Sequence, residues 1–101
     1  MSFAKRVMTL AAMIKHLSIK VTGQVQGVTF RYSAKLEADK LNIKGFAKNE
    51  DDGSVLIEAE GEEQALEDLI NWCKEGPDQA TVHQVKISPG TIQNYSKFST
   101  H

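Results

Sequence analysis

The alternation of apolar and polar residues in the first part of the chain predicts a β-strand. Leu17, Ile19 and Val21 are apolar, and the residues that separate and flank them from His16 to Thr22 are polar. A period of two places the apolar side chains on one face and the polar side chains on the other. We therefore expect a strand over residues 16–22 with one buried face.

Two later segments carry apolar residues at intervals of three and four, which is the period of an amphipathic helix. The first runs from Phe30 to Leu41 and the second from Glu62 to Glu75. Gly76-Pro77 ends the second, because glycine is favoured just after a helix and proline cannot continue one. The apolar faces consist of Phe30, Ala34, Ala38 and Leu41 in the first helix, and of Leu66, Leu69, Ile70 and Cys73 in the second.

Shorter alternating runs predict the remaining strands. Two of them flank Glu50-Asp51-Asp52-Gly53, and an Asp-Gly pair between alternating runs indicates a hairpin. Pro89-Gly90 ends a later strand. These strands are expected at residues 43–49, 54–60 and 82–88, with a short edge strand at 95–98.

The resulting order is strand, helix, strand, strand, helix, strand. This order is typical of the ferredoxin-like split βαβ arrangement, an α+β fold. It predicts one antiparallel sheet with both helices on one face. Such domains serve many functions, so the function must be argued from a site.

The length of 101 residues suits a single domain. An apolar run at residues 7–14 follows Lys5-Arg6 and has some features of a short signal or transit segment. The run is short and abuts the first strand. We therefore expect residues 1–15 to be a flexible N-terminal extension and residues 16–101 to be the folded domain.

Charge and cysteine content narrow the possible partners. The net charge of −1 gives no overall attraction to nucleic acid or to a membrane surface. The one cysteine, Cys73, excludes an intrachain disulfide, which fits a reducing, cytoplasmic location. Cys73 lies on an apolar helix face and is expected in the core rather than as a nucleophile. No histidine or cysteine spacing suggests a metal site, and no cofactor is expected.

A loop bounded by Gly23 and Gly27 connects the first strand to the first helix, with Arg31 in the first turn of that helix. Glycines let the backbone approach a ligand closely, and the free amides of a helix start favour an anion. A guanidinium there can bind two phosphate oxygens together. The segment therefore indicates an anion site, although a tight turn with a solvated arginine fits the spacing equally well.

Two segments of the sequence resemble the signature motifs of a known family. Gly23-Gln24-Val25-Gln26-Gly27-Val28-Thr29-Phe30-Arg31 resembles the acylphosphatase signature Gly-x-Val-Gln-Gly-Val-x-Phe-Arg. Gly45-Phe46-Ala47-Lys48-Asn49, followed by Gly53, Val55 and Gly61, is similar to the second signature of that family. The resemblance covers about residues 16–98. It departs at the C-terminus, where Thr100-His101 replaces the usual aliphatic-Arg-aromatic ending.

The resemblance implies hydrolysis of small acyl phosphates. The loop and arginine form a phosphoryl site that needs no metal, and the oligomeric state stays open, with a monomer as the default. Arg31 would bind the phosphate, and Asn49 would orient the attacking water. From the residues alone, Asn49 fits a turn position better than a catalytic one. The phosphate would also be held by the backbone of Gln24, Val25, Gln26, Gly27, Val28, Thr29 and Phe30.

Two other functions remain open at this point. A module that binds an anion without catalysis would share the loop and the arginine. A nucleic-acid binder is weaker, because the strands offer Phe46 but no aromatic and basic signature.

Overall fold

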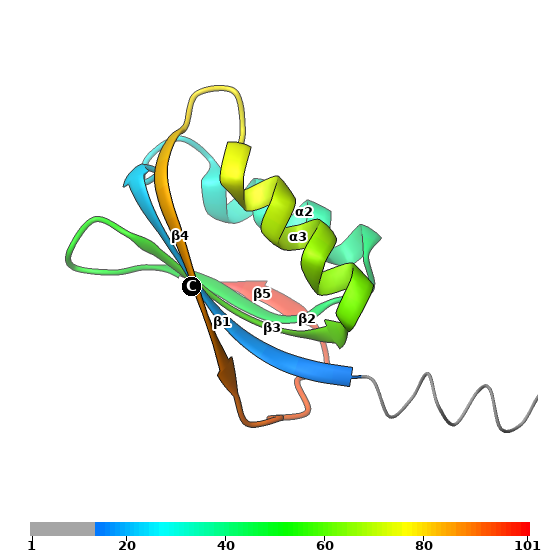
Figure 1. Ribbon diagram of the computed structural model, residues 1–101. Helices are drawn as coiled ribbons and strands as arrows, with labels where there is room; N and C mark the ends of the chain where they lie inside the picture. The colour runs from blue at the N-terminus through cyan, green and yellow to red at the C-terminus, as the bar shows by residue number, and fades with distance from the viewer. Residues whose placement is uncertain (1–13) are drawn as a thin grey trace, which may run out of the picture.

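The protein, described here by a computed structural model for residues 14–101, alternates strands and helices along the chain (Figure 1). Both helices begin close to the predicted positions, and each of the first four strands contains most of its predicted residues. The elements are β1 (Ile14–Gln24), α2 (Phe30–Lys40), β2 (Lys44–Asn49), β3 (Val55–Glu62), α3 (Glu63–Glu75), β4 (Thr81–Gly90) and β5 (Phe98–Thr100).

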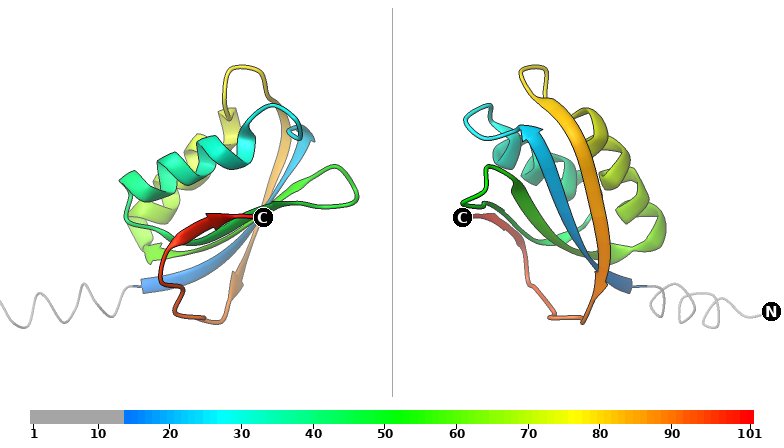
Figure 2. Two further views of the ribbon diagram at one scale, coloured as in Figure 1. Left: turned by 180° about the vertical axis from the view of Figure 1, so that it is seen from behind. Right: turned by 60° about the vertical axis from the view of Figure 1, so that its left-hand side comes forward.

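The five strands form one sheet in the order β4-β1-β3-β2-β5. Both helices pack on the same face of this sheet, and the other face carries no helix (Figures 1 and 2). The first four strands pair antiparallel, as the element order predicts. This is the ferredoxin-like α+β arrangement.

The pairing register brings the ends of β1 and β2 to one end of the sheet. Val55, the first residue of β3, pairs with Val21 near the end of β1 and with Asn49 at the end of β2. The loop that leaves β1 therefore starts beside the residue that ends β2. Segments far apart in the sequence are thus placed at a common edge by backbone hydrogen bonds.

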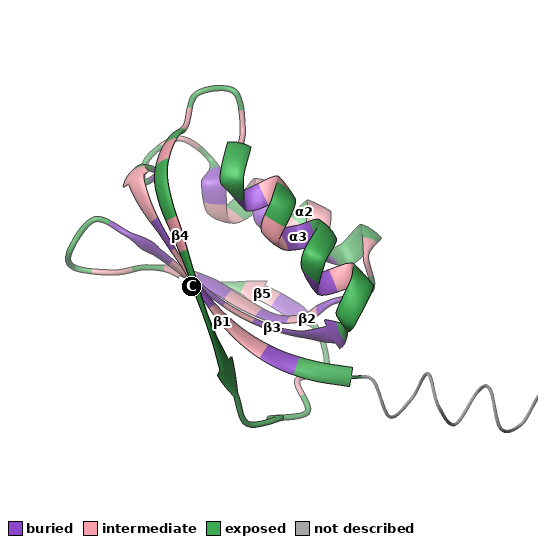
Figure 3. Ribbon diagram, in the orientation of Figure 1, coloured by how far each residue is buried: buried purple, intermediate pink, exposed green. Residues whose placement is uncertain are grey.

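The core lies between the sheet and the two helices, where buried residues face one another (Figure 3). Ile19 and Val21 are fully buried, as the alternation in β1 predicts. The helices contribute Phe30, Ala34 and Ala38 from α2, and Leu66, Leu69 and Cys73 from α3. The prediction that Cys73 is a core residue is confirmed. Its burial raises the pKa of the thiol to about 12, so it is not a nucleophile near neutral pH.

The C-terminal strand differs from its prediction in position and direction. It spans Phe98–Thr100 rather than residues 95–98, and it pairs parallel to β2. The sheet is therefore mixed, not wholly antiparallel. β4 finishes at the end of the sheet that lies away from Asn49, which is where β2 begins. The chain crosses that end and enters β5 from it, so β5 runs in the same direction as β2. The fourth strand also extends through Pro89-Gly90 instead of ending before them.

The first strand begins two residues earlier than the predicted start of the folded domain. Ile14 and Lys15 were assigned to a flexible extension, but both belong to β1, where they pair with Glu62 and Gly61. The rest of that predicted extension, residues 1–13, lies outside the described residues. Ile14 is out of phase with the apolar positions Leu17, Ile19 and Val21, so the alternation did not predict that Ile14 and Lys15 belong to the strand.

A polar cluster occupies the helix-free face at the start of β1. His16 is 6% exposed, and its two ring nitrogens contact two carboxylates of β3. The distances are 2.7 Å from Nδ1 to Glu60 and 2.5 Å from Nε2 to Glu58. Ser18 donates a hydrogen bond to Glu58, and the Tyr95 ring lies 6.0 Å from the imidazole. The alternation correctly placed His16 opposite the core but did not predict its burial.

The two carboxylates change how this cluster titrates. Burial by itself lowers the pKa of His16, but hydrogen bonds to Glu60 and Glu58 and their charges outweigh it, so the pKa is raised above 6.5. Burial likewise opposes ionisation of Glu60. The bonds from His16 and from the main chain at residues 93–95 outweigh that effect and lower its pKa below 4.5. Both shifts favour the pair of a protonated His16 and an ionised Glu60.

This charge state predicts a pH dependence of stability. The contribution of His16 is fully present below its ordinary pKa of 6.5 and is lost as the pH rises through its higher folded pKa. Urea unfolding between pH 5.5 and 9 measures it, with His16→Gln as the reference that cannot titrate. We expect the stability difference between the wild type and this variant to shrink with rising pH. A difference that stays constant across the range contradicts the assignment.

Candidate functional site

Just before the loop to α2, β1 contains a glycine that no other residue can replace without a clash. Gly23 has φ of 131°, and a Cβ on it would lie 2.1 Å from the carbonyl oxygen of Thr81. The pairing of β1 with β4 shifts register at this point. After the shift, Gly23 and Gln24 still pair with Val82 and Thr81, and the chain leaves the sheet only after Gln24, two residues later than the sequence predicted. Gly27 also has positive φ, 74°, but a Cβ there would meet no atom within 4 Å, so the loop is open on its outer side.

The first turn of α2 has free amides at the end of this loop. Thr29 precedes the helix in the left-handed conformation, with φ of 61°, and its side chain makes no capping hydrogen bond. The first helical amides have no carbonyl partner within their own helix. No acidic side chain lies in this turn, so no carboxylate of the turn itself neutralises the positive end of the helix dipole. These amides suit an anion.

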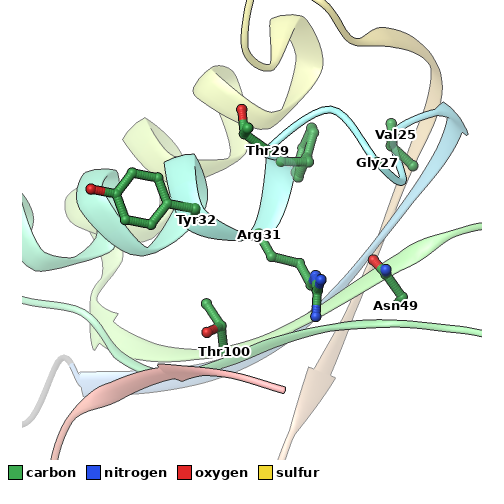
Figure 4. Close-up of a pocket in the computed structure, with 8 residues that line it drawn as sticks. Val25, Gly27, Thr29, Arg31, Tyr32, Asn49 and Thr100 are labelled. Atoms are coloured by element: carbon green, nitrogen blue, oxygen red, sulfur yellow. The ribbon is translucent and has the colours of Figure 1, made fainter.

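A pocket of about 180 Å³ lies at this point (Figure 4). Three elements meet around it: the loop with the start of α2, the end of β2, and β5. The side chains of Arg31 and Asn49 extend into the same space, whereas the Tyr32 ring lies farther along α2. The lining residues are Val25, Gly27, Thr29, Phe30, Arg31, Tyr32, Asn49 and Thr100.

The structure thus brings together the two residues that the sequence selected for chemistry. Arg31 is half-buried in the first turn of α2, and Asn49 is exposed as the last residue of β2. Arg31 donates a hydrogen bond from Nη1 to the main-chain oxygen of His101. His101 is itself tied to β2, because its amide donates to the carbonyl of Ala47 over 2.9 Å.

The predicted loop residues divide into three groups. Val25 and Phe30 are each 1% exposed, so their side chains belong to the core and only their main chain can face a ligand. Gly27 and Thr29 line the pocket directly. Gln24, Gln26 and Val28 do not line it.

The Gln26 side chain contacts the β2–β3 turn instead of the pocket, and the sequence did not predict this contact. Its side-chain amide donates hydrogen bonds to two carbonyls of the β2–β3 turn, those of Glu50 at 2.8 Å and Ser54 at 2.9 Å. Glu50 directly follows Asn49. The Gln26 side chain therefore holds the loop against the turn that carries Asn49. Only the tertiary structure shows this, since the donor and its acceptors are more than 20 residues apart.

The C-terminal wall of the pocket was also missed. Thr100 lines the pocket, and the His101 oxygen receives Arg31. A three-residue strand carries too little periodicity to be placed from its sequence. The one available signal was the position of Thr100-His101 shortly after the edge strand predicted at residues 95–98.

The described residues 14–101 contain no group of three or more His, Cys, Asp or Glu side chains suited to a metal ion. Within the same part of the chain, no helix has the length and apolar character needed to cross a membrane. The chemistry available at the pocket is that of a guanidinium, main-chain amides, a carboxamide and the hydroxyls of Thr29, Tyr32 and Thr100.

Comparison with known proteins gives a consistent picture. The acylphosphatase family model matches residues 17–100. An acylphosphatase of a Nocardioides species is 44% identical over 82 residues, covering 81% of this chain and 83% of the relative. The structure of an acylphosphatase from Coxiella burnetii superimposes with a TM-score of 0.87 at 34% identity, covering 90% of this chain and 96% of that one. The acylphosphatase from Bacillus subtilis gives a TM-score of 0.84 at 38% identity, covering 88% and 99%.

Proposed function

Because this chain belongs to the acylphosphatase family, hydrolases that act on acid anhydrides, we propose that the pocket around Arg31 and Asn49 cleaves the carboxyl–phosphate bond of small acyl phosphates. One observation carries this proposal. The guanidinium and the uncapped helix start come from one part of the sequence and the carboxamide from another, and all three border one small pocket.

The phosphoryl group would be held by the helix start and Arg31. The loop and first-turn amides supply several N–H donors, and the guanidinium adds two more in a plane that matches two phosphate oxygens. The first-turn amides and the guanidinium belong to α2, and the Gln26 side chain ties the loop to the β2–β3 turn, so we expect little rearrangement when the group arrives. The His101 oxygen holds Arg31 at the pocket through one nitrogen.

Asn49 would position the attacking water. Its carboxamide can accept a hydrogen bond from a water and donate another, and it extends into the same space as Arg31 (Figure 4). In the step we propose, the water oxygen bonds to phosphorus as the bond from phosphorus to the acyl oxygen breaks. The products are a carboxylate and inorganic phosphate, and the water's proton leaves with phosphate or bulk solvent. The exposed Asn49 is not itself a proton acceptor.

The chemistry needs no strong acid at the leaving group. A carboxylate is already stable as an anion at neutral pH, since carboxylic acids have pKa values of about 4. Phosphoryl transfer then depends on placement and on stabilisation of charge around phosphorus. In this proposal the guanidinium and the amides would stabilise the charge, and Asn49 would place the water.

The size of the pocket favours a small target. Its volume of about 180 Å³ is below the range of roughly 300–1,000 Å³ that encloses drug-sized ligands. The phosphoryl group would fill it, and the acyl group would project past Tyr32 and Thr100 toward solvent.

The proposed reaction can be assayed directly. The purified protein, incubated with benzoyl phosphate in excess EDTA, should release inorganic phosphate. Phosphate binding without turnover would instead favour an anion-binding module.

The proposal predicts a severe loss of function for Arg31→Ala. Removing the guanidinium should reduce kcat/KM for benzoyl phosphate by at least about 100-fold, the usual effect of deleting one donor to a transition-state charge, and should weaken phosphate binding. Arg31→Lys should also fail, because a point charge replaces a planar fork. Lys35→Ala, one turn later in α2, is the control. Wild-type turnover by Arg31→Ala would rule out the assigned role.

Asn49→Ala should separate binding from catalysis. Without the carboxamide the water loses its orientation, so kcat should fall by about 100-fold while the inhibition constant of inorganic phosphate stays within about twofold. Asn71→Ala, on the exposed face of α3, is the matched control. If Asn49→Ala loses phosphate affinity and keeps kcat, the residue binds phosphate and does not position water.

A further inference from the structure

The connection between β4 and β5 is held by a carboxylate on the helix-free face. Residues 91–97 cross the end of the sheet that lies away from the pocket, from the β4 edge to the β5 edge (Figure 2). Glu60 of β3 is 5% exposed and lies under this crossing. Its carboxylate accepts hydrogen bonds from three consecutive main-chain amides, those of Gln93, Asn94 at 2.9 Å and Tyr95 at 3.3 Å.

The backbone of the crossing is shaped for this contact. Asn94 has φ of 60°, in the left-handed region, and alternation between right- and left-handed residues turns successive amides toward one point. His16 binds the same carboxylate from β1, so four donors surround Glu60. A carboxylate has about four acceptor positions, and Glu60 therefore has all of its hydrogen bonding satisfied although it is buried.

Beyond this anchor, the chain leads directly to the pocket. Lys97 accepts a hydrogen bond from the amide of Gly45 at 3.0 Å, and β5 then pairs with β2 through residues 98–100. His101 follows, with its amide on Ala47 and its oxygen on Arg31. A strand of three residues at a sheet edge is weak alone, so its placement depends on how the chain enters it.

We propose that Glu60 is a positioning residue for Arg31, acting through the 93–95 main chain and β5 on the His101 oxygen that receives the guanidinium. The proposal rests on the phosphate-binding role of Arg31 given above. Glu60 lies at the opposite end of the sheet from the pocket and touches no substrate. It fixes the start of the C-terminal segment so that the end of that segment meets Arg31.

A matched pair of variants tests this. Glu60→Gln keeps the shape but gives up one acceptor oxygen and the charge, so the three amides lose part of their partner. Glu58→Gln makes the same change on the same strand and face. Glu58 contacts His16 and Ser18 but does not hold residues 93–95, which makes it the control.

We expect Glu60→Gln to raise KM for benzoyl phosphate and the inhibition constant of inorganic phosphate by about fivefold to tenfold, with kcat changed less than about twofold. Amide hydrogen exchange at residues 97–101 should speed up by at least about tenfold. Glu58→Gln should stay within about twofold of wild type in all of these. If Glu60→Gln does not fold, Glu60→Asp, whose shorter carboxylate cannot reach all three amides, replaces it.

Two results would overturn the proposal. One is a Glu60 variant with wild-type phosphate affinity and wild-type exchange at residues 97–101. The other is faster exchange with unchanged phosphate affinity and an unchanged NMR signal of the Arg31 Nε–H group, because the segment then moves without moving Arg31. The exchange and NMR readouts need no turnover. Failure of the wild type to hydrolyse acyl phosphates would therefore count against the proposed function and leave these two readouts to decide the role of Glu60.

Discussion

The site depends on the register of three strands at Val55. Pairing of this residue with Val21 on one side and with Asn49 on the other fixes which segments meet at that end of the sheet. The loop and helix start that carry Arg31 follow from the first pairing, and the position of Asn49 follows from the second. A slip of one residue in either pairing would turn Asn49 or the buried face of β1 to the opposite side. Backbone hydrogen bonds in the sheet thus determine the geometry of the pocket.

The sequence predicted the parts of this arrangement that are set locally. Alternation in β1, the helical periods of α2 and α3 and the Asp-Gly turn each depend on neighbours within a few residues, and these elements were located within about two residues. Arg31 and Asn49 were selected by motif, and the structure places both at one pocket. Their roles in catalysis remain proposals.

The features that sequence reasoning missed depend on distant contacts. His16 reads as a surface residue of β1, and its burial results from the crossing of residues 91–97 and from two glutamates more than 40 residues away. The direction of β5 is set by where β4 ends. The tether from Gln26 to the β2–β3 turn joins two loops. None of these contacts has a period or a spacing that a single sequence displays.

The two ends of the sheet carry different features. One end holds the pocket, and the other holds the polar cluster that anchors the C-terminal segment.

The claim that the loop and helix start bind the phosphoryl group can be tested by NMR. The main-chain amide signals are followed while inorganic phosphate is added. We expect the shifts to concentrate at residues 24–32 and at the Arg31 side chain. Shifts that concentrate instead on the helix-free face, around Lys20 and Lys86, would contradict it.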